Sequence, residues 1–67
     1  MDRRYSPMVK RVGMGFYRRY IGAVRVAVRE DLIGSLIRRV TAERSDIVTV
    51  EFRIRAMASA VRQGYDY

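Results

Sequence analysis

The chain has 67 residues and contains neither cysteine nor histidine, so disulfide bridges and the usual zinc ligands are excluded. A domain of this length buries only about 60% of its unfolded surface, which leaves oligomerisation as the common remaining source of stability and predicts a homo-oligomer. Fourteen basic residues against seven acidic ones give a net charge of +7, and thirteen of the bases are arginine, which favours an anionic partner held by bidentate contacts.

The N-terminal residues 1–8 contain paired arginines and the only proline, without any hydrophobic period, so we predict a flexible basic arm. Arg3 and Arg4 are its candidates for contacts with a phosphate backbone. A single small domain is expected over residues 9–62, with residues 63–67 as a frayed tail. No apolar run approaches the ~20 residues of a membrane span and no signal-type segment is present, so we expect no membrane span and an intracellular location (cytoplasm or nucleoid) or one within a virion.

Residues 9–22 have apolar side chains at every third or fourth position, which favours a helix. Three glycines oppose this prediction because each costs about 1 kcal/mol relative to alanine in a helix interior, and an irregular loop or an edge strand is the alternative. The FYRRY block at residues 16–20 interleaves aromatic and basic side chains. That composition suits stacking on bases or holding a nucleic-acid backbone, and equally suits an amphipathic packing segment.

The hydrophobic period changes within residues 23–42. Valines alternate with other residues in the segment 24–29, so an extended chain would place three valines on one face and two arginines on the other. Apolar residues then recur at helical spacing, and we expect a helix from Asp31 to about Glu43 with Asp31 as its N-cap. A short basic strand followed by a helix is therefore predicted.

Ser45 or Asp46 is predicted to cap the next element. The segment 47–55 fits two structures. Spacings of three and four form the seam of a helix at Ile47, Val50, Ile54, Met57 and Val61. The same segment also alternates apolar and polar residues as a strand does, and its β-branched composition favours the strand. Residues 56–62 are predicted to be helical in either case.

The order of these elements resembles the ribbon-helix-helix DNA-binding family over residues 23–62, in the segments VRVAVRED, DLIGSLIRRVTAE and SDIVTVEFRIRAMASAVR. The resemblance implies a mainly α fold with a short β-ribbon (α+β), built as a small intertwined dimer or another oligomer whose paired ribbons lie in the major groove. It also implies that outward ribbon residues contact bases and that the second helix approaches a phosphate. The DNA-binding residues implied in this way are Arg25, Ala27, Arg29 and Ser45, with backbone contacts from Arg3 and Arg4.

A structural or assembly subunit of a virion, filament or larger complex is the competing interpretation, and an all-α helical hairpin is its expected fold. In that interpretation the helical seam and the aromatic side chains form an interface rather than a core. The interface residues would be Phe16, Tyr20, Ile47, Val50, Phe52, Ile54, Met57 and Val61. An RNA- or ribosome-associated protein is a third interpretation, because the arginine content fits although no RNA module is recognisable.

Chemistry at an active site is not expected from this composition. Thiol and imidazole groups are absent, and Glu30 and Asp31 are adjacent and so diverge, which predicts no catalytic residues, no metal site and no cofactor. A core this small is also expected to leave little room for a water-excluding pocket of ~300 Å³ or more. The sequence therefore predicts a non-enzymatic protein, and the resemblance implies a transcriptional regulator that binds nucleic acid, with DNA preferred over RNA.

Overall fold

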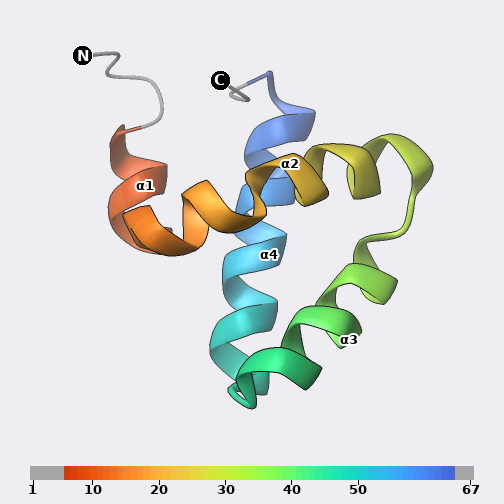
Figure 1. Ribbon diagram of the computed structural model, residues 1–67. Coiled ribbons are helices and arrows are strands. Elements are labelled where there is room, and N and C mark those ends of the chain that lie inside the picture. The colour runs from red at the N-terminus through yellow and green to blue at the C-terminus, as the bar shows by residue number, and fades with distance from the viewer. Residues whose placement is uncertain (1–5, 65–67) are drawn as a thin grey trace.

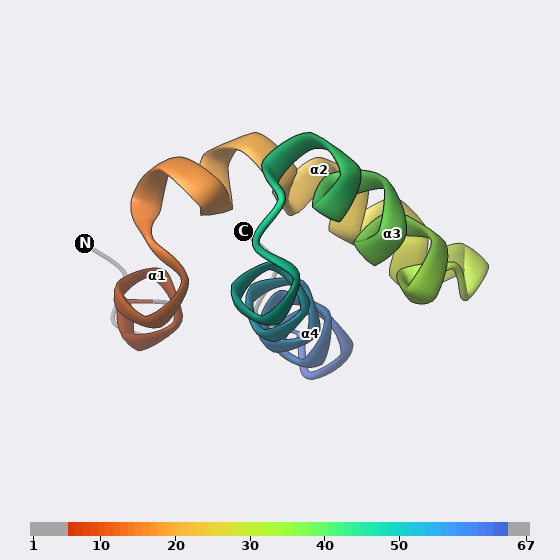
Figure 2. The ribbon, with the colours of Figure 1, turned by 90° about the horizontal axis from the view of Figure 1, so that it is seen from below.

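The computed structural model describes residues 6–64, which form four helices: α1 (Ser6–Val12), α2 (Met14–Glu30), α3 (Ile33–Arg44) and α4 (Ile47–Arg62) (Figure 1). Helices account for 88% of these residues and none of them lies in a strand, so the fold is all-α. α4 is the central element and contacts each of the other three helices. Seen along its axis, α4 has α1 on one side and α2 and α3 across another, which leaves one face uncovered (Figure 2).

The core forms within a single chain. Its largest fully buried side chains come from all four helices and include Val12, Val24, Val40, Val50, Ile54 and Met57. Burying one such side chain is worth ~1.5–3 kcal/mol. The seam predicted for a helical α4 therefore supplies the centre of the core, and the helix is held by contacts with α1, α2 and α3.

The β-ribbon predicted for residues 24–29 is wrong, because this segment belongs to α2. Alternation puts Val24 and Val26 on one face of a strand, yet Val24 is fully buried and Val26 is 42% exposed. The helical period of three to four residues prevails over the two-residue period of a strand. One face of α2 is buried at Phe16, Tyr20, Val24 and Ala27. Residues 6–64 therefore contain no ribbon on which the predicted intertwined dimer could be built.

The strand alternative for residues 47–55 is also excluded, because these residues begin α4. A strand would align Val48 and Phe52 with Val50 and Ile54, but Val48 is 80% exposed and Ile54 is fully buried. β-propensities of different residue types differ by at most ~1 kcal/mol per residue, whereas burying one large aliphatic side chain contributes ~1.5–3 kcal/mol. The four-helix fold thus differs both from the predicted α+β fold and from a helical hairpin.

Gly13 separates α1 from α2. Its φ of 96° lies where L side chains are disfavoured, so glycine permits the turn between the two helices. The other glycines that opposed a helix, Gly15 and Gly22, lie inside α2, where a Cβ would meet no atom within 4 Å. Their propensity cost is offset by the buried face of the same helix.

The junction between α2 and α3 is a Schellman motif. The Asp31 N–H donates to the Val28 carbonyl at 3.3 Å and the Leu32 N–H donates to the Ala27 carbonyl at 2.8 Å. Asp31 adopts the left-handed conformation at φ 59° and ψ 46°, which aspartate tolerates better than most residues. Asp31 is therefore the C-cap of α2, and its predicted role as the N-cap of α3 is wrong because Leu32 occupies that position.

The junction between α3 and α4 uses both polar residues predicted there. Ser45 ends α3 in the left-handed conformation, and its N–H donates to the Thr41 carbonyl at 2.8 Å. Asp46 is the N-cap of α4, and its carboxylate accepts the Thr49 N–H at 3.2 Å. The predicted cap at this break is confirmed for Asp46.

Candidate nucleic-acid interface

The residues expected to contact DNA do not form one surface. Arg25 is half-buried and Arg29 is exposed on α2, whereas Ala27 is a core residue with 6% exposure. Ser45 is exposed, but the start of α4 beside it is already capped by the negative Asp46, which opposes a phosphate there. Arg3 and Arg4 lie outside the described residues.

The residues expected at an assembly interface divide into two groups. The structure places five of them in the chain's own core: Phe16, Tyr20, Val50, Ile54 and Met57. Val61 is half-buried beside that core. Ile47 and Phe52 are accessible, with 61% and 49% exposure, and so remain available to a partner.

Phe16 and Tyr20 form an aromatic pair on successive turns of α2. Their ring centroids are 4.6 Å apart with an interplanar angle of 48°, and both residues are at most 7% exposed. The Tyr20 hydroxyl donates to Glu43 Oε1 on α3 at 3.1 Å. These rings are inaccessible to bases, so the structure supports the packing interpretation of the FYRRY aromatics.

Three arginines from three helices surround this pair. The guanidinium carbons of Arg44 on α3 and Arg53 on α4 lie 5.7 and 5.1 Å from the centroid of Phe16. The guanidinium carbon of Arg19 lies 5.7 Å from the centroid of Tyr20. Phe16, Arg19, Tyr20, Arg44 and Arg53 are named here the arginine–aromatic cluster.

The electrostatics of the arginine–aromatic cluster favour an anion. Within residues 6–64, no carboxylate forms an ion pair with Arg19, Arg44 or Arg53. The nearby Glu43 accepts the hydrogen bond of Tyr20, and an ion pair lies elsewhere, between Glu51 and Arg55. A guanidinium that stacks on a ring through its face keeps its N–H donors at its edge, where phosphate oxygens can accept them.

Arg44 and Arg53 were missed as functional candidates in the sequence. Each has a simpler local role: Arg44 lies in the last turn of α3, where a cation complements the helix dipole, and Arg53 is a polar residue in the alternating pattern of residues 47–55. Each lies far along the chain from Phe16, and only the packing of α3 and α4 against α2 brings them together. The FYRRY block was the one local signal, since it contains both rings and Arg19.

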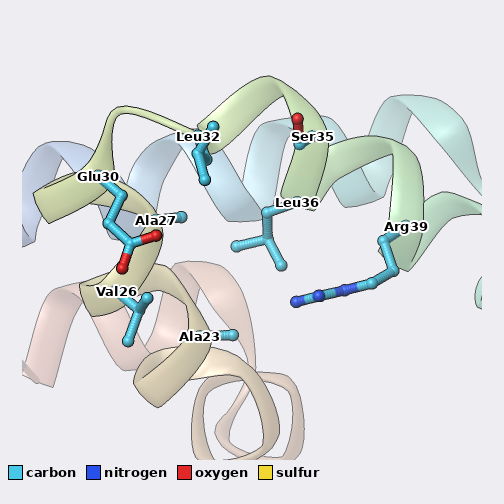
Figure 3. A pocket seen from close by; sticks show the side chains of 8 residues that line it. All are labelled: Ala23, Val26, Ala27, Glu30, Leu32, Ser35, Leu36 and Arg39. Carbon is cyan, nitrogen blue, oxygen red and sulfur yellow. The ribbon is translucent and has the colours of Figure 1, made fainter.

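A groove lies between the C-terminal half of α2 and the start of α3 (Figure 3). It has a volume of about 460 Å³ and is open to solvent, so it is not the water-excluding pocket for which so small a core was expected to leave little room. The diverging helices create it at their junction, at the edge of the core, whose residues Ala27 and Leu36 form part of its lining. Its lining is mainly aliphatic, with Glu30 and Arg39 as its charged residues.

No protein-family model matches this sequence, and no curated protein or solved structure is significantly similar to it. In residues 6–64, no helix combines the length and the apolar character that crossing a membrane requires. The same part of the chain contains no cluster of three or more His, Cys, Asp or Glu side chains that could ligate a metal ion.

Proposed function

We propose that this chain is a small, non-enzymatic nucleic-acid-binding protein that holds a phosphate backbone with the arginine–aromatic cluster. The observation that carries the proposal is the convergence of Arg19, Arg44 and Arg53 from three helices on two buried rings. Each cation–π contact is worth ~0.5–1 kcal/mol at an exposed site. Such contacts restrict the guanidinium positions before binding, so less side-chain entropy is lost when a phosphate is bound.

The proposed contacts are with phosphates rather than with base edges. The rings of Phe16 and Tyr20 are buried, and α2 replaces the ribbon that would have read bases. Duplex DNA is the proposed ligand, because it carries one negative charge per ~1.7 Å of helix axis and the chain has a net charge of +7. Binding should therefore be weakly sequence-dependent and strongly salt-dependent.

A DNA titration followed by fluorescence anisotropy tests the proposal. Affinity for a labelled duplex should fall with NaCl concentration between ~50 and ~200 mM, with a slope that reflects the number of phosphate contacts. The double variant Arg44→Gln/Arg53→Gln should bind about 10- to 100-fold more weakly at the lower salt concentration. Its salt slope should fall by roughly 2, because each lost contact removes ~0.9.

The matched control is Arg38→Gln/Arg62→Gln, which removes the same charge from exposed arginines outside the cluster. A similar loss of affinity in both double variants would show that diffuse charge binds DNA and would refute the cluster. Binding that does not depend on salt, or no binding by the wild-type protein, would refute the nucleic-acid proposal. Circular dichroism of each variant shows whether the helices are retained. The variant Arg53→Lys keeps the positive charge but removes the planar guanidinium, so its affinity for DNA shows which of the two the binding needs.

A further inference from the structure

The exposed large hydrophobic side chains gather mainly in two places. Val26 and Leu32, exposed by 42% and 47%, line the groove between α2 and α3. Ile47, Val48 and Phe52, exposed by 61%, 80% and 49%, lie on the first two turns of α4, with Val48 and Phe52 on one face, and are named here the α4 ridge. In a chain whose charge should keep its surface polar, two such places indicate contact with another apolar surface.

The groove is concave, and its walls belong to rigid elements. The Schellman motif sets the angle at which α3 leaves α2 and places Leu32 beside the last turns of α2. In Figure 3, Leu36 points into the space between the two helices, Glu30 lies at one end and Arg39 extends into it from the other. An apolar groove of about 460 Å³ therefore has an acidic and a basic end.

The α4 ridge is convex and also carries one charge of each sign. Glu51 and Arg55 lie one turn apart on the same side of Phe52 and pair with each other at 2.9 Å while remaining 46% and 61% exposed. The guanidinium carbon of Arg11 on α1 lies 5.7 Å from the Phe52 centroid, and the ring still remains half exposed. An acid and a base one turn apart thus lie beside the apolar side chains of the ridge, and both are exposed enough to pair with charges of another molecule instead of each other.

We propose that the groove between α2 and α3 receives the α4 ridge of a second copy of this chain. The apolar side chains of the ridge would fill the groove, with Glu51 placed towards Arg39 and Arg55 towards Glu30. This arrangement brings each charge beside the ridge to an opposite charge of the groove, which is the complementarity that selects this occupant. It goes beyond the proposed nucleic-acid binding, since none of these residues belongs to the arginine–aromatic cluster.

One copy cannot fill its own groove. The groove lies at the beginning of α3 and the ridge beyond its end (Figure 1), and a helix of 12 residues spans ~18 Å. The contact is therefore between two different surfaces, and such head-to-tail contacts continue into a chain of copies unless their rotation closes a ring. Because copies with a charge of +7 repel each other, screening by salt should strengthen this association while weakening DNA binding.

Sedimentation velocity of the full chain without nucleic acid tests the proposal. The mean mass of the wild-type protein should rise with protein concentration from about 10 μM to 1 mM and should rise further from about 0.15 M to 1 M NaCl. Val48→Lys in the ridge and Val26→Lys in the groove should each be monomeric. Ala42→Lys adds the same charge at an exposed position of α3 outside both surfaces and should behave as the wild type.

A mixture of the two monomeric variants distinguishes a contact between ridge and groove from any other interface between copies. Val48→Lys retains an intact groove and Val26→Lys retains an intact ridge, so an equimolar mixture should form a dimer of one copy each and grow no further. A wild-type protein that remains monomeric overturns the proposal. It is overturned equally if Val26→Lys associates like the wild type, or if the mixture stays monomeric while the wild type associates, since the contact would then not join ridge to groove. Helical circular dichroism of both variants excludes unfolding as the cause.

Discussion

Ile54 and Ile47 allow the same substitution to be compared at two positions of one helical seam. Both lie in α4, seven residues apart, but Ile54 is fully buried while Ile47 is 61% exposed. Ile54→Ala should therefore destabilise the protein strongly, because the cavity forms where α4 packs against the rest of the core. Ile47→Ala removes the same atoms from a position where most of them already contact water.

The size of this difference follows from burial. A buried isoleucine replaced by alanine costs ~2–5 kcal/mol, of which alanine's better helix propensity recovers a few tenths. A 67-residue chain with ~0.05–0.15 kcal/mol of stability per residue has about 3–10 kcal/mol in total. Ile54→Ala should therefore remove about a fifth of the stability or more, whereas Ile47→Ala should change the free energy of unfolding by at most ~0.5 kcal/mol.

Urea unfolding followed by the helical circular dichroism signal measures both variants. With a slope of ~1 kcal/mol/M for so small a protein, Ile54→Ala should lower the midpoint by about 2 M or leave the protein unfolded in buffer. Ile47→Ala should keep the wild-type midpoint when measured at a dilute protein concentration. Losses that agree within ~0.5 kcal/mol would refute the central position of α4 in the fold.

Two further predictions concern the junctions between helices. Asp31→Gly should raise the free energy of unfolding by ~0.5 kcal/mol. Glycine removes the ~1–2 kcal/mol that a left-handed backbone costs an L-residue, but it also increases the conformational entropy of the unfolded chain, which cancels part of that stabilisation. Asp31→Val should instead lower it by ~1 kcal/mol or more, and a glycine variant less stable than the valine variant in urea would contradict the Schellman assignment. Asp46→Ala should lower the midpoint of thermal unfolding through a loss of ~1 kcal/mol, whereas Asp46→Asn should nearly retain it; equal losses would show that the bond to Thr49 does not cap α4.

Several local features could be predicted because neighbouring residues determine them. The helix expected from Asp31 to about Glu43 is observed as α3, whose buried residues are the predicted apolar stripe of Ile33, Leu36, Ile37 and Val40. The cap at Asp46 followed from a short polar side chain before an apolar run. Periodicity and capping act within one or two turns, so the sequence contains the information they need.

The candidate surfaces could be predicted only in part. The FYRRY block identified two rings and Arg19, but nothing local indicated that Arg44 and Arg53 would lie over Phe16. The groove and the ridge likewise depend on the angle between α2 and α3 and on which side of α4 remains uncovered. Such features are properties of pairs of elements, and no single segment contains them.

The sequence by itself determined the basic charge, the absence of thiol and imidazole chemistry, the apolar stripe of α3 and the break at Asp46. The tertiary structure alone decided that residues 24–29 and 47–55 are helical. Both segments carry two hydrophobic periods at once, and their β-branched residues favour the shorter one by at most ~1 kcal/mol each. Helical geometry instead buries Val24, Val50 and Ile54 against other helices, and each such burial contributes ~1.5–3 kcal/mol.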